Sequence, residues 1–231
     1  MSIFCTDYHT PLGTNRLFLS GALCWALAFS GLVNAQSAPP CGVISGDRPH
    51  YGPIDYRKAN KQQLSLVEGV HFTPGVETLT RPGSSYFGDD LSYTLRVFPN
   101  HHRALITIQR LAEREKTDSP AHAEFSVACY FDRGLRYAPD DTVLRMLYAR
   151  YLIRQNQLNE AVRHLGEVIR LAGDNAFTHF NAGLIFFDMK DYDRALIQAH
   201  RAINLGFTRP DLKDRLDAVG KWTEPPAATP E

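Results

Sequence analysis

The sequence predicts an all-α fold, a short solenoid of helical hairpins preceded by a loop-rich N-terminal arm. Residues 142–207 contain two copies of one unit, because a shift of 34 residues places Ala149 on Gly183 and Ala161 on Ala195. Larger apolar residues recur between these small residues at helical spacing. By contrast, proline and glycine recur between residues 36 and 95 at intervals too short for long helices.

Length and composition limit the class of protein. The chain has 231 residues, of which 44% are hydrophobic and 22% charged, and this suits one globular unit of medium size with an adequate core. Its 25 Lys and Arg residues balance 25 Asp and Glu residues. Without the basic surface that phosphate backbones require, we do not expect a nucleic-acid partner.

Residues 1–35 are expected to be a signal peptide. Arg16 precedes an uncharged apolar run that ends near Ala35, and the small residues there are typical of a cleavage site. Cleavage predicts an exported protein of the bacterial periplasm that is not attached to the membrane. The alternative is an inner-membrane protein anchored by this helix, because about seventeen apolar residues are at the lower limit of a span.

Two cysteines remain once this segment is removed, Cys41 and Cys129. An even pair in an exported chain predicts a disulfide, which here closes a loop of nearly ninety residues, about 3 to 5 kcal/mol of stabilisation in the chain-entropy model. The alternative is two free thiols. With no further cysteine and no CxxC motif in the mature chain, we expect no structural zinc site.

Residues 36–99 form the loop-rich arm. Its many aromatic and aliphatic residues need burial, so we expect the arm to pack on the helices. Residues 100–139 are expected to form a divergent first repeat with a lengthened turn, in which Asn100 caps the first helix and Pro139 ends the second.

Two clearer repeats occupy residues 140–207. Asp140 or Asp141 is expected to cap one first helix, and Asp174 or Asn175 the next. Residues 208–222 predict an end helix, with Thr208 as its cap and a polar outer face that closes the stack. The tail, residues 223–231, is expected to be disordered.

The second unit resembles the tetratricopeptide repeat family at Gly183, Phe186, Tyr192, Ala195 and Ala202. The first unit matches less well, with Ala149 for the usual glycine and Leu158 for the usual aromatic residue. The resemblance implies a scaffold of stacked helical hairpins whose first helices line a concave groove. A scaffold does not name a function, which has to be argued from a site.

Carrying the family's groove positions over gives a mostly apolar surface with two arginines at one side. The implied residues are Val143, Met146, Arg150, Ile153, Arg154, Phe177, Phe180, Asn181, Leu184, Phe187 and Asp188. Two ligands suit it: an extended peptide whose acidic group meets Arg150 and Arg154, or a partner helix. The alternative is that the protein's own aromatic arm fills the groove, since so apolar a bare patch is a liability.

Metal and catalytic sites have little support in the sequence. His101 and His102 are adjacent, so on a helix they point about 100° apart, and no HExxH spacing accompanies them. GxSxG, P-loop and strand-linked GxGxxG motifs do not occur. We therefore expect no cofactor, no metal and no enzymatic activity.

The sequence thus predicts an exported module that binds another protein or a peptide. One alternative is a membrane-tethered factor for assembly or secretion in the cell envelope. An alternative of another class is a hydrolase or metal-dependent enzyme with its site in the arm, near the phrases GPIDY and FPNHHR.

Overall fold

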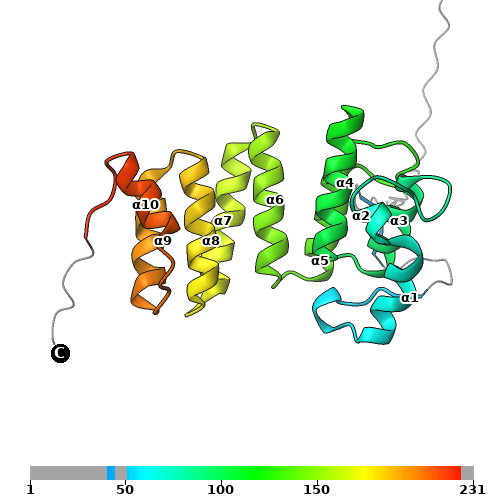
Figure 1. The fold of residues 1–231 in the computed structure, drawn as a ribbon, viewed down its shortest axis with the longest axis horizontal. Coiled ribbons are helices and arrows are strands. Elements are labelled where there is room, and N and C mark those ends of the chain that lie inside the picture. Colours follow the sequence, from blue (N-terminus) through cyan, green and yellow to red (C-terminus); the bar gives the residue numbers. More distant parts are fainter. Residues whose placement is uncertain (1–40, 45–50, 225–231) are drawn as a thin grey trace, which may run out of the picture. The chain divides into compact units, whose positions relative to one another are not determined.

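The computed structural model describes residues 41–44 and 51–224 of the chain. They belong to one compact unit, Ala38–Glu231, and the expected signal peptide lies outside the described residues. The secondary structure of the described part is helical and contains no strand, which confirms the all-α prediction. Figure 1 shows the elements in chain order. They are a 3-10 helix (Tyr56–Lys58), α1 (Lys61–His71), α2 (Pro74–Glu77), α3 (Phe87–Val97), α4 (His102–Glu115), α5 (Val127–Tyr137), α6 (Thr142–Arg154), α7 (Leu158–Ala172), α8 (Ala176–Asp188), α9 (Tyr192–Asn204) and α10 (Asp211–Ala218).

Two consecutive hairpins are the most closely packed part of the chain. α6 packs on α7 and α8 packs on α9, as expected for a helical-hairpin solenoid (Figure 1). The first helix of each hairpin starts in the same way: the Asp141 side chain accepts a hydrogen bond from the backbone N–H of Leu144, and Asn175 does so for Thr178. These caps satisfy N–H groups that have no partner within the helix.

The small residues of the repeat lie where helices approach closely. Ala149, Ala161 and Ala195 have no exposed surface. At Gly183 an added Cβ would lie 2.4 Å from Cδ2 of Leu212 in α10. The glycine therefore permits α10 to pack against α8, which explains why a small residue recurs at this position.

Residues 100–139 contain α4 and α5, which pack on each other and are joined by the loop 116–126. The cap of α4 differs from the expected one. His101 accepts the hydrogen bond from the N–H of Ala104, whereas Asn100 accepts from the N–H of Tyr56 in the arm. Asn100 is buried and used for tertiary contact, so it is not available as a cap.

The arm contains more helix than its composition predicts, because α1, α2 and α3 all precede residue 99. Gly69, Gly75 and Gly88 lie within these helices, and Pro74 begins α2. Asn60 and Gln63 form a capping box at the start of α1, and Thr73 caps α2 immediately before Pro74. The helices are short, which is what frequent proline and glycine impose, but they are helices nonetheless.

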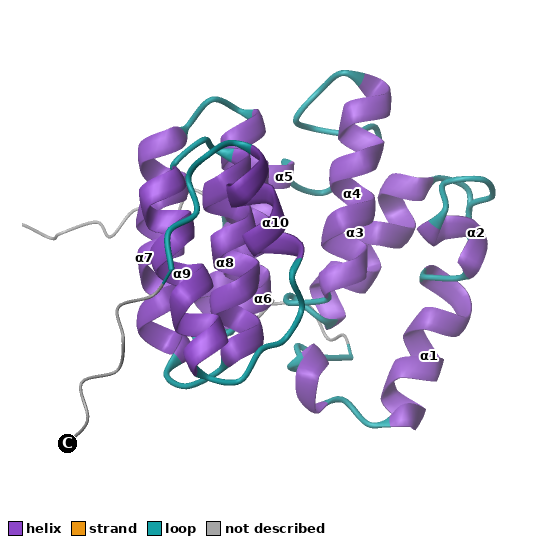
Figure 2. Cartoon of the chain, turned by 60° about the vertical axis from the view of Figure 1, so that its left-hand side comes forward, coloured by secondary structure: helices purple, strands orange, loops and turns teal. Residues whose placement is uncertain are grey.

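The arm packs on the start of the helical array. α3, the last helix of the arm, packs on α4, and α2 contacts α4 as well, whereas α1 packs on α3 within the arm (Figure 2). A small core of Val67, Val97 and Phe98 forms under the 3-10 helix, separate from the main core that continues from α2 to α10. Apolar residues of the arm are thus buried among its own helices and against α4.

The predicted disulfide between Cys41 and Cys129 is present, with the two Cα atoms 5.1 Å apart. It ties residues 41–44 to α5. Arg133 reinforces the attachment, because its Nη1 donates to the backbone oxygens of Cys41 at 2.9 Å and of Val43 at 2.7 Å. Arg136 donates to the oxygen of Gly42 in the same way.

The end helix is shorter than expected. α10 begins at Asp211, directly after Pro210, and has no side-chain cap, so the prediction of Thr208 as its cap is wrong. Proline suits this position because it needs no N–H partner. α10 packs on α8 and α9. Residues 225–231 lie outside the described part.

Candidate partner-binding face

The candidate site lies on the first helices of successive hairpins. α4 contacts α6, α6 contacts α8, and α8 contacts α10, so these helices form one continuous surface. We call its central part, made by residues of α4, α6 and α8, the α4–α6–α8 face. All eleven residues that the tetratricopeptide resemblance implied belong to α6 and α8.

Two of the expected groove residues are not presented to a ligand. Met146 is 8% exposed and Phe180 is 4% exposed. Both belong to the main core, and Phe180 packs against Phe207 with ring centroids 4.5 Å apart. The spacing of the repeat could not reveal this, because Phe207 comes from the connection after α9.

The other apolar residues remain accessible to different degrees. Val143 is 40% exposed and Phe177 is 56% exposed, and they occupy equivalent positions in consecutive repeats. Ile153, Leu184 and Phe187 are partly buried. Asn181 donates a hydrogen bond to the backbone oxygen of Phe177, so its amide is already engaged within α8.

The charged residues of this face form ion pairs between helices. Arg154 of α6 lies 3.2 Å from Glu113 of α4, and Arg150 lies 3.5 Å from Asp188 of α8. Asp188 also lies 3.4 Å from Arg215 of α10. Each of these side chains is about half exposed, and such pairs contribute about 0–1 kcal/mol. An incoming carboxylate could therefore replace Glu113 or Asp188 at little cost.

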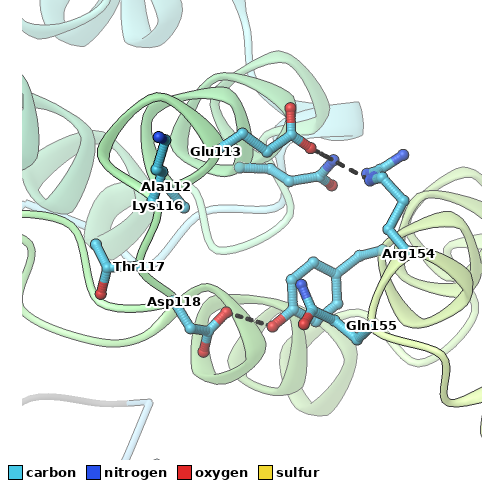
Figure 3. A pocket seen from close by; sticks show the side chains of 9 residues that line it. Ala112, Glu113, Lys116, Thr117, Asp118, Arg154 and Gln155 are labelled. Atoms are coloured by element: carbon cyan, nitrogen blue, oxygen red, sulfur yellow. Dashed lines mark hydrogen bonds and ion pairs between the residues drawn. The ribbon is translucent and has the colours of Figure 1, made fainter.

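A pocket of about 380 Å³ opens between the ends of α4 and α6 (Figure 3). Tyr151 lines the pocket and donates a hydrogen bond to Asp118 of the loop after α4. Burial raises the pKa of Tyr151, and the Asp118 carboxylate raises it further, so the phenol stays neutral. Glu113, Lys116 and Arg154 line the rim.

The sequence did not single out this pocket. Tyr151 follows Arg150 in the repeat and has a core spacing, while Asp118 belongs to a loop whose path no local pattern predicts. A helix-terminal lysine at 116 in the left-handed conformation, φ 56°, directs the chain back toward α6. Only the tertiary structure brings Tyr151, Asp118 and Lys116 together.

The helices of the arm do not pack mainly against α6 or α8. Its helices α1 and α2 pack on α3 and α4. The described arm meets α6 only near its start, where Arg57 lies 2.9 Å from Asp140 and 3.6 Å from Asp141. Residues 51–99 therefore do not fill the groove, which was the alternative that the sequence left open. Phe177 remains exposed.

The phrases GPIDY and FPNHHR meet in a buried polar network. Asn100 donates to Asp55 at 2.7 Å and to Asp141 at 2.9 Å, and Nε2 of His102 lies 2.8 Å from Asp141. Burial opposes ionisation of Asp141, but the hydrogen bonds from His102, the Leu144 N–H and Asn100 outweigh it and lower its pKa. Because each group has its partner, the network joins the arm to α4 and α6.

The histidines have structural partners. His101 is buried, and burial lowers its pKa to about 3. Its Nδ1 accepts from the N–H of Ala104 and its Nε2 lies 2.9 Å from Glu68, an arrangement that suits the neutral ring. The described residues contain no group of three His, Cys, Asp or Glu side chains placed to hold a metal ion. His50 lies outside them.

Comparison with known proteins does not assign the chain to a family. No protein-family model matches the chain, and no curated protein matches it significantly. Among the described helices, none is both long enough and apolar enough to cross a membrane. The site therefore has to be judged by its own geometry.

Proposed function

We propose that this chain is an exported interaction module that binds a segment of another protein along the α4–α6–α8 face. The observation that carries the proposal is the pair of exposed apolar side chains, Val143 and Phe177, at equivalent positions of neighbouring helices. Helices packed in this way have axes about 8–10 Å apart, so an extended segment could contact both.

The ion pairs of the face support an acidic group in the partner. Arg150 and Arg154 point from one helix toward carboxylates on its two neighbours, α8 and α4. Exchanging an intramolecular carboxylate for one on the partner keeps each guanidinium paired, which favours recognition of a defined sequence. The pocket beside Tyr151 offers space for one larger side chain at the end of the segment.

The resemblance to tetratricopeptide repeats agrees with a binding role. The disulfide that joins the arm to α5 supports export. A disulfide persists in oxidising compartments and is rare in the cytosol, so the Cys41–Cys129 bond suits a periplasmic protein. The apolar N-terminal stretch provides the means of export.

Site-specific photo-crosslinking in the producing cell tests the proposal. A photoreactive residue at Phe177 should yield a discrete crosslinked species. The same residue at Ile197 of α9 is the matched control, since Ile197 is 60% exposed and belongs to a second helix. Equal crosslinking from both positions, or none from Phe177, would refute binding on this face.

Charge reversal gives a second test. Arg150→Glu combined with Arg154→Glu should weaken partner capture from an envelope extract and leave helicity unchanged. Arg163→Glu combined with Arg170→Glu on α7 is the control, because it also reverses two exposed ion-paired arginines. If the α6 and α7 variants recover the same amount of partner, the binding surface lies elsewhere.

A further inference from the structure

A second cavity, of about 460 Å³, lies beside α3 in the N-terminal part of the chain. Its walls come from four segments: the end of α1, the turn 83–85, α3 and the loop 121–124. Ligand pockets in proteins have volumes of about 300–1,000 Å³ and a few convergent polar groups. The partner-binding face uses none of these residues.

Arg96 of α3 is the most unusual group in this cavity. Its guanidinium lies over the ring of Tyr93, 5.3 Å from the ring centroid, but among the described residues it makes no hydrogen bond, and its Nε is buried without a hydrogen-bond partner. The nearest carboxylate, on Glu124, lies 3.8 Å from Nη1, which is an ion pair beyond hydrogen-bond distance. A buried donor without an acceptor costs about 1–3 kcal/mol, so a missing acceptor is indicated.

The wall formed by the end of α1 and the turn 83–85 is held in place by a buried carboxylate. Asp90 has no exposed surface and accepts hydrogen bonds from the N–H groups of Gly83 and Ser84. It also lies 3.0 Å from Nδ1 of His71, whose ring lies 4.1 Å from that of Tyr93. His71 is therefore fixed in orientation, and within the described part of the chain its Nε2 has no hydrogen-bond partner.

The loop 121–124, which also lines the cavity, is fixed by contacts with α3 and with Tyr86. His122 has φ 61°, an uncommon conformation for a residue other than glycine, and its ring stacks on Tyr86 at 3.6 Å. The loop lies directly on α3, because an added Cβ at Gly88 would be 2.1 Å from the oxygen of Ala121. Rigid walls reduce the entropy lost when a ligand binds.

The cavity presents both signs of charge. Arg96 supplies a cation, and Asp89 and Glu124 supply two carboxylates. A ligand with only a carboxylate would be repelled by the two acids, and one with only an ammonium would be repelled by Arg96. We propose that the cavity binds a free α-amino acid, with its carboxylate on Arg96 and its ammonium between Asp89 and Glu124. Tyr93 also lines the cavity, beside the guanidinium that would hold the carboxylate.

Calorimetry on the mature, disulfide-bonded chain tests this with three matched probes. L-phenylalanine carries both charges, 3-phenylpropionate lacks the ammonium, and phenethylamine lacks the carboxylate. We expect phenylalanine to bind at least tenfold more tightly than either analogue, a difference of about 1.4 kcal/mol. Equal binding of 3-phenylpropionate would overturn the proposal in favour of a simple anion site. Absence of binding by all three would overturn it in favour of a water-filled cavity.

Two near-isosteric variants identify the contacts. Arg96→Gln should weaken phenylalanine about tenfold and strengthen phenethylamine, because the repelling cation is removed. Glu124→Gln should weaken phenylalanine and strengthen 3-phenylpropionate, because one repelling carboxylate is removed. Arg110→Gln, on the exposed side of α4, is the control and should alter neither. Unaltered phenylalanine affinity in Arg96→Gln, with an unchanged melting temperature, would refute the assignment.

Discussion

The buried network around Asp141 allows a quantitative test of how the arm and the repeats are joined. Asp141 is 1% exposed, caps α6 through the N–H of Leu144, and accepts from Asn100 at 2.9 Å and His102 at 2.8 Å. The change Asp141→Ala removes all three hydrogen bonds. It also leaves two side-chain donors without their acceptor.

The expected loss follows from these contacts. Removing an N-cap costs about 1 kcal/mol. Leaving a buried donor unpaired costs about 1–3 kcal/mol, and His102 and Asn100 each retain some access to other partners, so we expect a total loss of about 2–4 kcal/mol. The equivalent cap of the next repeat, Asn175, is exposed and accepts only from Thr178, so Asn175→Ala should cost about 1 kcal/mol.

Urea unfolding of both variants, followed by circular dichroism, measures the difference. The midpoint should fall further for Asp141→Ala than for Asn175→Ala, without a large change in slope. The difference should shrink as the pH falls through the lowered pKa of Asp141, because the ionised form makes the native contacts. Equal losses in the two variants at neutral pH would refute the network as a link between arm and repeats.

Three further predictions concern other parts of the fold. The double change Cys41→Ser and Cys129→Ser should lower the free energy of unfolding by about 3–5 kcal/mol, and native protein should gain the mass of two hydrogens on reduction. Since burial lowers the pKa of His101 from 6.5 to about 3, unfolding takes up a proton between these pH values. Stability should therefore fall as the pH drops below 6.5, and less steeply in His101→Gln. Finally, Gly166→Ala should stabilise by about 0.5–1 kcal/mol, because an added Cβ meets nothing within 4 Å, whereas Gly183→Ala should destabilise by about 1–3 kcal/mol through overpacking.

For each of these three predictions, one experimental outcome would contradict it. Two alkylatable thiols in the unreduced protein would contradict the disulfide. Identical pH slopes in the wild type and His101→Gln would contradict the assignment to that ring. Stabilisation by both glycine substitutions would show that α8 and α10 are less closely packed than the contact at Gly183 indicates.

The parts of the fold that local pattern determines could be predicted from the sequence. The hairpins between residues 140 and 207 follow from helical spacing and small residues, and Asp141 and Asn175 belong to the predicted caps. The helices of the arm were missed because each is short and bounded by breakers, so its periodicity is weak. Their stability comes from packing on one another and on α4, which no window of sequence contains.

The candidate sites depend more on tertiary structure. The groove positions were found by equivalence within the repeat, but burial of Met146 and Phe180 depends on neighbours from other elements. The ion pairs of Arg150 and Arg154 join residues 38 to 41 positions apart and could not be inferred from helix spacing. No sequence pattern singled out Arg96, because a hydrogen-bond donor is unpaired only by virtue of the residues that surround it in the folded structure.

The disulfide also determines how the chain carries mechanical load. The bond joins residues separated by 88 positions, and α1 to α4 lie within the closed loop. A pull on the two ends of the protein passes from residue 41 directly to residue 129, and the enclosed segment, about 300 Å if fully extended, cannot be drawn out. On the C-terminal side of the bond, tension can unravel α6 to α10 and the part of α5 that follows Cys129. The arm and its cavity are thereby shielded from any force that reaches the repeats.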